Sequence, residues 1–303
     1  MIYTVTINPT LDYVIDVDEV TLGRTNRPTD EFYRPGGKGV IESMVFRNLG
    51  HYNTALGFIA GFTGQQIKRA LVDCKVNMDF IELPRGNSRM CVIVNSTQET
   101  RFNGRGPQIE EFHINLFKSK LQRLQDGDVL TFAGSIPPTM HETFYADMMR
   151  ALPKRDIKVV VDATGALLKR ALPERPFLVK PNNHELGDIF DVEIETKEDA
   201  KKYGLELQKL GAQNVIVSMG AQGAVFIDID GNTYEADSCK GEVVNTIGAG
   251  DSMIAGFVSG YLEREDYEYA FHKGMCAGAA TAQTKGFATK EAVEALMKEN
   301  FGY

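Results

Sequence analysis

Strand-like and helix-like segments alternate along most of the chain. The helix-like stretches repeat apolar residues every three to four positions, as at 41–49 and 109–124, and two long helices rich in small residues are expected at 249–262 and 267–284. Between them stand short apolar or β-branched runs, at 2–7, 55–60, 128–132, 158–161, 177–179 and 215–218. Strands that alternate with long helices form βαβ units, so the sequence predicts a mainly parallel, Rossmann-like α/β sheet with helices on both faces.

Two segments, about 12–35 and 87–104, depart from this alternation because their strand-like pieces have no helix between them. We expect these segments to form a small separate sheet that is inserted at two points of the fold. Such a sheet over the carboxyl ends of the main strands would act as a lid on a binding site. The sequence has no internal repeat, so residues 1–303 are expected to form a single domain.

Charge and composition exclude several functions. A net charge of −8 and a pI near 5.3 argue against nucleic-acid binding, and an anionic ligand would need a local basic cluster. The four cysteines are far apart, which favours neither disulfides nor a zinc site. Residues 1–9 lack signal-peptide features and no apolar run is long enough to span a membrane, so a cytoplasmic location is expected.

The turn at Gly248-Ala249-Gly250-Asp251 carries the most specific chemical signal. Its glycines let backbone N–H groups converge at a helix start, where the helix dipole favours a phosphate. Asp251 could accept the proton of a hydroxyl that attacks a phosphoryl group. The alternative is a glycine-rich helix start with an aspartate that favours the dipole. The turn is neither a Walker loop nor a dinucleotide fingerprint, so a nicotinamide-dependent dehydrogenase is a poor third reading.

A second group of residues suits an anionic, hydroxyl-rich substrate. Gly37 and Lys38 open a predicted helix, where glycine permits close approach and lysine supplies a positive charge. Arg89 begins a lid strand, and Asp12 follows the first strand. Together, Lys38 and Arg89 would give the basic cluster that a phosphate-bearing substrate needs. A structural turn, a solvated arginine and a turn-stabilising aspartate are the alternatives.

A third group follows two later strands. Asn182 could contact nucleotide phosphates and Glu185 could hold a metal-bound water, although Asn182 as a helix N-cap with Glu185 in the first turn explains the same residues. The segment Ser218-Met219-Gly220-Ala221-Gln222-Gly223 could form one wall of an adenine site, or it could be a hairpin turn.

These motifs, in this order, resemble the ribokinase-like family, in particular its phosphofructokinase-B branch of 1-phosphofructokinases and tagatose-6-phosphate kinases. The resemblance runs from residue 1 to about 300. It rests on six blocks, which are Thr6-Ile7-Asn8-Pro9 with Asp12, 35–39, 133–137, Lys180-Pro181-Asn182 with Glu185, 218–224 and 246–252.

The resemblance implies ATP and Mg²⁺ as cofactors and a sugar phosphate as substrate. It makes Gly248, Ala249 and Gly250 the anion hole and Asp251 the base. It implies substrate-binding roles for Asp12, Gly37, Lys38, Arg89, Asn103 and Arg27. It implies nucleotide-binding roles for Lys180, Asn182, Ser218, Gly220, Gly223, Gly248 and Gly250, and a magnesium role for Glu185.

Two positions differ from the family pattern. Ile41 stands where an asparagine normally bonds a substrate hydroxyl, and Arg101 reverses the charge of the usual glutamate in a lid strand. The opening block through Lys38 and the run at 57–62 are more similar to the 1-phosphofructokinases, so fructose 1-phosphate is the first expected substrate and tagatose 6-phosphate the second. A nucleotide- or sugar-phosphate-binding regulator without catalysis is the alternative from another class. The open edges of the lid could also pair with a second subunit as a homodimer.

Overall fold

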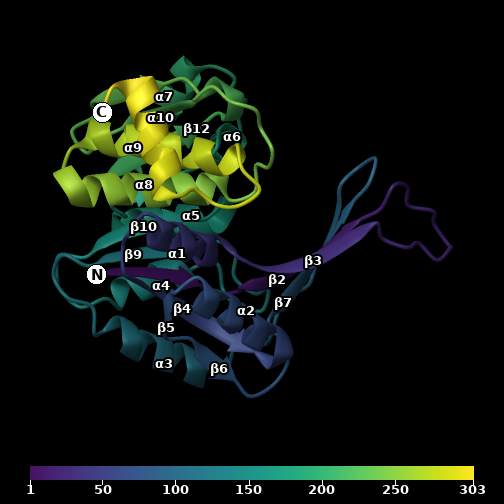
Figure 1. Cartoon of the computed structure of the whole chain (residues 1–303). Helices are drawn as coiled ribbons and strands as arrows, with labels where there is room; N and C mark the ends of the chain where they lie inside the picture. Colours follow the sequence, from purple (N-terminus) through teal and green to yellow (C-terminus); the bar gives the residue numbers. More distant parts are fainter.

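The computed structural model describes all 303 residues as a ten-stranded sheet flanked by helices, with a second sheet of four strands that projects from it (Figure 1). The large sheet has the order β14-β13-β12-β11-β10-β9-β1-β4-β5, with β6 also paired to β4. Its strands are β1 (Ile2–Thr6), β4 (Asn53–Ala60), β5 (Asn77–Met78), β6 (Ile81–Leu83), β9 (Val129–Ala133), β10 (Lys158–Asp162), β11 (Leu178–Val179), β12 (Asn214–Ser218), β13 (Ala224–Ile227) and β14 (Thr233–Ala236).

Ten α-helices and two short 3₁₀ helices connect these strands. They are α1 (Lys38–Asn48), α2 (Gly61–Asp73), α3 (Glu111–Leu121), α4 (Phe144–Arg150), α5 (Gly165–Ala171), α6 (Asn183–Phe190), α7 (Lys197–Lys209), α8 (Ala249–Arg264), α9 (Tyr267–Ala282), α10 (Lys290–Phe301), η1 (Leu172–Glu174) and η2 (Gly220–Gln222). No helix combines the length and the apolar composition that crossing a membrane requires.

The predicted parallel sheet is confirmed by the strand pairing. Only β13 and β14, at one edge, run antiparallel to their neighbours. The strands from β4 through β1, β9, β10 and β11 to β12 all pair in parallel, so their carboxyl ends meet at one edge of the sheet. The segments that follow β1, β9, β10, β11 and β12 therefore lie side by side at this edge, where open α/β sheets bind ligands.

Both faces of the large sheet are buried, which explains its continuous apolar strands. Strand β9, for example, has no exposed residue. Helices α1, α2, α8, α9 and α10 supply one hydrophobic cluster, and helices α3 to α7 supply the other. Two helix-covered faces are the arrangement in which purely apolar parallel strands are stable.

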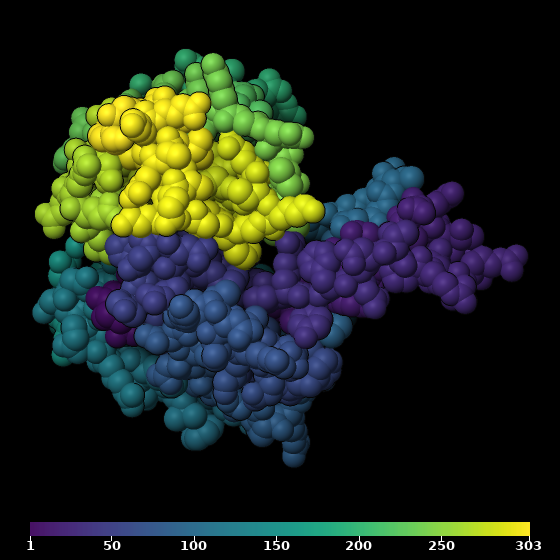
Figure 2. Space-filling view, viewed as in Figure 1, coloured from purple at the N-terminus to yellow at the C-terminus, as the bar shows by residue number.

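The smaller sheet, which we call the lid sheet, consists of β3 (Asp30–Gly36), β2 (Thr10–Asp16), β7 (Arg89–Asn95) and β8 (Thr100–Asn103), in this order. It extends away from the body as a narrow arm (Figure 2). Strands β2 and β3 pair antiparallel, β7 and β8 pair antiparallel, and β2 pairs in parallel with β7. The two inserted segments predicted from the sequence thus contribute two strands each to one sheet.

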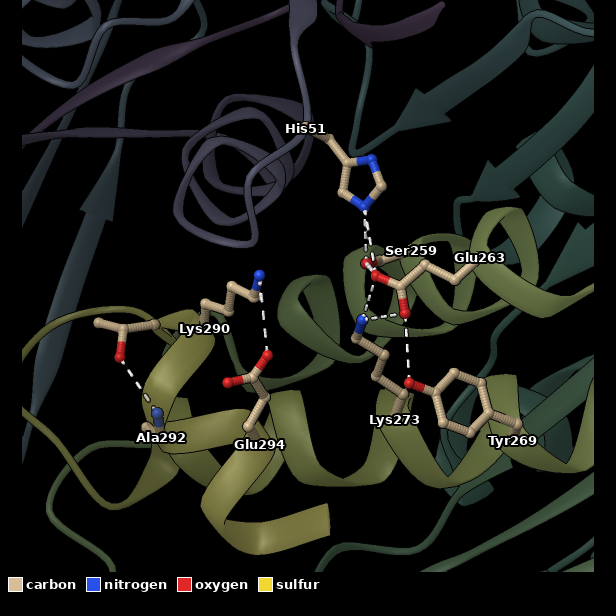
Figure 3. A network of polar contacts seen from close by, with 9 residues as sticks. His51, Ser259, Glu263, Tyr269, Lys273, Lys290, Ala292 and Glu294 are labelled. Atoms are coloured by element: carbon tan, nitrogen blue, oxygen red, sulfur yellow. Dashed lines mark hydrogen bonds and ion pairs between the residues drawn. The ribbon is translucent and has the colours of Figure 1, made fainter. Parts of the chain in front are cut away.

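A network of polar contacts joins the far ends of α1 and α8 (Figure 3). His51, just after α1, places its Nε2 2.8 Å from the Ser259 hydroxyl of α8. Glu263, one turn further along α8, accepts two hydrogen bonds of 2.6 Å from Lys273 of α9 and a third from Tyr269. Because α1 and α8 both begin at the edge where the parallel strands end, these contacts join the two helices at the ends opposite that edge.

Candidate functional site

A cavity of about 310 Å³ lies at the edge where the parallel strands end. The starts of α1 and α8 and the ends of β1, β9 and β10 surround it on the body side, and the lid sheet forms the opposite wall. Several residues predicted from the sequence line this one cavity, namely Asp12, Gly37, Lys38, Arg89, Asn103, Gly248 and Asp251.

The turn before α8 has the conformation that an anion-binding helix start requires. Gly248 is the N-cap and has a φ of 81°, and a Cβ there would lie 2.7 Å from the Phe287 ring. The N–H of Ala249 donates to the Thr246 carbonyl at 3.2 Å, whereas the N–H groups of Gly250 and Asp251 have no backbone acceptor. These two groups, in the first turn of a helix, are free to donate to a ligand.

Asp251 is a buried carboxyl group on the cavity surface, with 7% of the residue exposed. Burial raises its pKa to about 6, the charge of Asp162 adds to the shift, and the charge of Lys38 opposes it. A carboxylate with a pKa just below neutrality is ionised at pH 7 and still basic enough to accept a proton, which suits a general base.

Lys38 is held by a second carboxylate, Asp162, which the sequence analysis did not identify. Its Nζ lies 3.0 and 2.9 Å from the two Asp162 oxygens and 4.0 Å from Asp251. Although burial acts to raise the pKa of Asp162, the charges of Lys180 and Lys38 and the Lys38 hydrogen bond lower it. The only signal for Asp162 was its position at the carboxyl end of a predicted parallel strand.

Lys180, predicted to bind nucleotide, lies directly beside the α8 turn. It is 5% exposed, and a Cβ on Gly250 would lie 3.0 Å from its Nζ. The nearby carboxylates of Asp162 and Asp251 form their ion pairs with Lys38 rather than with Lys180. A buried lysine without a paired carboxylate is costly unless a ligand supplies the negative charge, so its position favours an anion at this turn.

Asn182 and Glu185 form a complete capping box at the start of α6. The Asn182 side chain accepts from the Glu185 N–H, and the Glu185 carboxylate accepts from the Asn182 N–H, each at 2.8 Å. The helix-capping role, which was the alternative interpretation of these two residues, is therefore present in the structure. No three His, Cys, Asp or Glu side chains come close enough together to hold a metal ion by themselves.

Ser218 is the last residue of β12, and Gly220 and Gly223 lie in the connection to the antiparallel strand β13, which contains η2. The N–H of Ser218 donates to the Pro181 carbonyl at 3.1 Å, which places this segment beside Asn182 at the same sheet edge. None of these three residues lines the 310 Å³ cavity. They stand further along the edge, beyond Lys180.

Several residues that line the cavity carry buried polar atoms that have no partner within the chain. These buried atoms are Thr6 Oγ1, Asn8 Oδ1 and Arg89 Nε. Buried polar atoms are normally hydrogen-bonded, so such a group on one cavity surface indicates a ligand that is rich in hydroxyl and anionic groups. Asp12 lies among these residues. Burial raises the pKa of its carboxyl group, whereas the charges of the nearby arginines act to lower it.

Arg27 is the one predicted substrate-binding residue that lies away from the cavity. It belongs to the exposed connection between β2 and β3 and does not line the cavity of its own chain.

Ile41 and Arg101, the two departures from the family pattern, both line the cavity. The residue after Ile41 also went unrecognised in the sequence. Glu42 is fully buried, with one carboxyl oxygen 2.5 Å from the Thr131 hydroxyl and the other without a partner. Burial raises its pKa to about 8, and the charge of Asp162 adds to this shift.

Comparison with known proteins agrees with this arrangement. A family model described as "pfkB family carbohydrate kinase" matches residues 5–293. The chain is 39% identical over 299 residues to the 1-phosphofructokinase of Bacillus subtilis. The matched region covers 99% of this chain and 98% of that protein. It is 36% identical to the D-tagatose-1-phosphate kinase of Bacillus licheniformis, with 94% of each chain covered.

A solved structure has the same fold throughout. Phosphofructokinase-2 from Escherichia coli, in complex with substrates and products, superposes with a TM-score of 0.91 and 26% identity over 99% of both chains.

Proposed function

This chain belongs to the pfkB family of carbohydrate kinases, and we propose that it transfers the γ-phosphoryl group of ATP to fructose 1-phosphate, giving fructose 1,6-bisphosphate. The observation that carries the proposal is that Asp251 and Arg89 line one cavity. A buried base and a guanidinium with an unpaired Nε suit a substrate that has both a reactive hydroxyl and a phosphate.

Gly250 and Asp251 of the α8 turn, together with Lys180, have defined tasks in this reaction. ATP, when bound, supplies the phosphoryl group, and the substrate hydroxyl oxygen forms the new P–O bond while the bond to the ADP oxygen breaks. Asp251 accepts the hydroxyl proton. The N–H groups of Gly250 and Asp251 donate to the oxygens of the transferred group, and Lys180 neutralises charge beside them.

Lys38 and Asp162 keep this region ordered and electrostatically balanced. Asp162 holds the Lys38 ammonium group at the start of α1, 4.0 Å from the Asp251 carboxylate. The positive charge favours the ionised form of Asp251 and thereby opposes the effect of burial on its pKa. In this proposal Lys38 also faces the substrate, together with Gly37, Asp12 and Asn103.

Glu185 is the residue that we propose for magnesium. Mg²⁺ keeps several waters and is commonly bound through one or two carboxylates together with substrate phosphates, so a cage of protein ligands is not required. The capping box uses one carboxylate oxygen of Glu185, and its other oxygen forms no hydrogen bond within the chain. The ion would neutralise charge on the phosphates of ATP.

Asn182, Ser218, Gly220 and Gly223 would bind the nucleotide along the sheet edge beyond Lys180. We propose one domain over 1–303 with the lid sheet inserted, and a homodimer formed through that lid. In such a dimer, Arg27 would be available to the site of the second subunit rather than to the site of its own chain. The cytoplasmic location stays a prediction.

A tagatose phosphate is the second candidate substrate. Ile41 places an apolar side chain on the cavity surface, so the pattern of hydroxyl contacts differs from the usual one of the family. One of the relatives described above is named for tagatose 1-phosphate, and tagatose 6-phosphate was the second expectation from the sequence.

The direct test supplies the purified protein with ATP, Mg²⁺ and a panel of ketoses. The panel contains fructose 1-phosphate, fructose 6-phosphate, tagatose 1-phosphate, tagatose 6-phosphate and unphosphorylated fructose, and ADP release is measured. We expect the highest kcat/KM with fructose 1-phosphate and a decline below pH 6, because Asp251 must be ionised.

Asp251→Asn is the matched variant for this test. It should lower kcat by about 10²–10⁴-fold, since it removes the base, while ATP binding persists. Absence of turnover with every ketose phosphate would refute the proposed activity and favour the non-catalytic regulator.

A further inference from the structure

A cluster of arginines on the lid sheet is not explained by the roles assigned so far. Alternation along β7 and β8 places Arg89, Cys91, Ile93, Arg101 and Asn103 on the same face, and all five line the cavity. Arg89 stands two residues before Cys91 on this face, and Arg101 lies opposite Ile93, two residues after Cys91, so the two arginines flank Cys91 along β7. The cavity wall therefore presents two arginines around one point.

The negative charge in their surroundings is smaller than this positive charge. Asp12, which pairs with Cys91 across β2 and β7, is the carboxylate of the wall, and it is influenced by Arg34 as well as by Arg89 and Arg101. Arg89 leaves its buried Nε without a hydrogen-bond partner. In a chain of net charge −8, three arginines beside two carboxylates, Asp12 and Glu99, form a local basic site.

Arg101 is held only loosely in the present arrangement. Its Nε donates to Glu99 at 2.6 Å, and its two terminal nitrogens form no hydrogen bond within the chain. Both side chains of this pair are more than 40% exposed, with values of 43% and 46%. An exposed pair of this kind contributes little to stability, so the terminal nitrogens remain free to donate to an anion.

From this geometry we infer that Arg101 is a specificity-determining residue, which binds the phosphate that the substrate already carries together with Arg89. The inference rests on the proposed function, which supplies a phosphorylated ketose as ligand. Two guanidinium groups offer a phosphate several charge-assisted hydrogen bonds from opposite sides. The substitution that reverses charge in this lid strand thus strengthens selection for a phosphorylated sugar over a neutral one.

Steady-state kinetics with Arg101→Gln test this inference. Loss of hydrogen bonds to a charged group should raise KM for fructose 1-phosphate by roughly 10- to 100-fold. We expect kcat to stay within about threefold and KM for ATP to be unchanged, because Arg101 does not touch the transferred group. Arg101→Lys should be intermediate, since it restores charge without the planar fork.

Arg105→Gln is the matched control. Arg105 is an exposed arginine four positions further along the chain, and it does not line the cavity. Its replacement removes the same charge and should leave KM for fructose 1-phosphate within about twofold of the wild-type value, since surface charges away from the ligand act weakly. An equal effect of both variants, or a wild-type KM in Arg101→Gln, would overturn the inference and leave the kinase activity standing.

A binding measurement separates this inference from the proposed activity. Inorganic phosphate and fructose 1-phosphate are each added to nucleotide-free protein, and the rise in the thermal unfolding midpoint is recorded. Both should stabilise the wild type and the Arg105→Gln control, and both should stabilise Arg101→Gln much less. If no ketose phosphate is turned over, this result still decides the role of Arg101, and equal stabilisation of all three proteins would refute it.

Discussion

Five ionisable side chains share the buried region beneath the cavity, namely Lys38, Lys180, Glu42, Asp162 and Asp251. If all were ionised, three negative charges would face two positive ones in surroundings that solvate charge poorly. Burial raises the pKa of Glu42 to about 8, so this carboxyl group is protonated at neutral pH. The remaining four groups then carry two positive and two negative charges, and Lys180 is the one among them that forms no ion pair within the chain.

Glu42→Gln tests this protonation state through stability. The Glu42 pKa is about 8 in the folded protein and 4.5 as its ordinary value, so the folded state holds the proton more tightly. Its contribution to stability is present at low pH and is lost as the pH rises through 8. Glutamine mimics the protonated form, so the variant should gain stability relative to the wild type between pH 6 and pH 9, by about 1–4 kcal/mol.

Urea unfolding at the two pH values measures this gain. Glu235→Gln, which replaces an exposed glutamate of β14, is the control and should leave the pH dependence as in the wild type. Parallel stability curves for wild type and Glu42→Gln would show that Glu42 is ionised in the folded protein.

Single site residues were predictable from the sequence where residues next to them in the chain determine the local backbone conformation. Lys38 and Asp251 stand beside glycines at helix starts, and both line the cavity. Asp162 has no such local mark, because its importance comes from Lys38, which is 124 positions away. Glu42 resembles any charged residue in a helix, and only the packing of α1 against the sheet buries it completely. The identity of the sugar depends on the same long-range geometry.

At the scale of elements, two helices begin at the site through glycines in conformations that other residues rarely adopt. Gly37, before α1, has a φ of 103°, and Gly248, before α8, has a φ of 81°. At both positions a Cβ would come within 3.0 Å of a neighbour, either Thr6 or Phe287. The helix starts are therefore fixed by steric requirements as well as by hydrogen bonds.

Gly248→Ala should impair catalysis as well as stability. The left-handed conformation costs about 1–2 kcal/mol for a residue with a Cβ, and contact with Phe287 would displace the turn that carries the free N–H groups. We expect kcat to fall by at least about tenfold, because a shift of about 1 Å at reacting groups can cost roughly 10²-fold. Denaturant unfolding and saturating kinetics measure the two effects.

Gly231→Ala is the control that separates the effect of backbone strain from the effect of displacing the turn before α8. Gly231 has the same φ of 81° but no atom near its Cβ position, and it lies in the turn between β13 and β14. It should lose about 1–2 kcal/mol of stability and keep the wild-type kcat. A wild-type kcat in Gly248→Ala would mean that the turn does not depend on glycine.

Element types were predictable and several boundaries were not. Helix α3 covers Glu111–Leu121 rather than 109–124, and α8 extends to Arg264 rather than 262. Helix ends depend on caps and neighbouring segments, which periodicity does not report. The parallel pairing of β2 with β7 also has no local signal, since each strand resembles half of an independent hairpin.

At the scale of the whole molecule, the lid sheet has a second surface that faces away from the cavity. Tyr33 and Phe102 lie on this outer face and are 59% and 61% exposed. The edge strands β3 and β8 also leave backbone groups unpaired. Exposed edges with aromatic side chains are suited to association with a second copy, which supports the proposed homodimer.

Sedimentation of the wild type should give twice the chain mass of 33.6 kDa. Phe102→Glu should shift the protein toward the monomer, because it places a charge in the apolar contact. Phe112→Glu is the control, since Phe112 is 65% exposed but lies on α3 of the body. Equal masses for wild type and Phe102→Glu at every concentration would exclude association through this face.

The connection between the two halves of the lid sheet has a consequence for the order in which the molecule assembles. Thr10 pairs with Arg89, and the intervening chain forms α1, β4, α2, β5 and β6 of the body. Closing so long a loop is entropically unfavourable until those elements have brought the two strands together. A nascent chain is thus expected to complete the lid sheet late in folding, after the larger sheet that supports it.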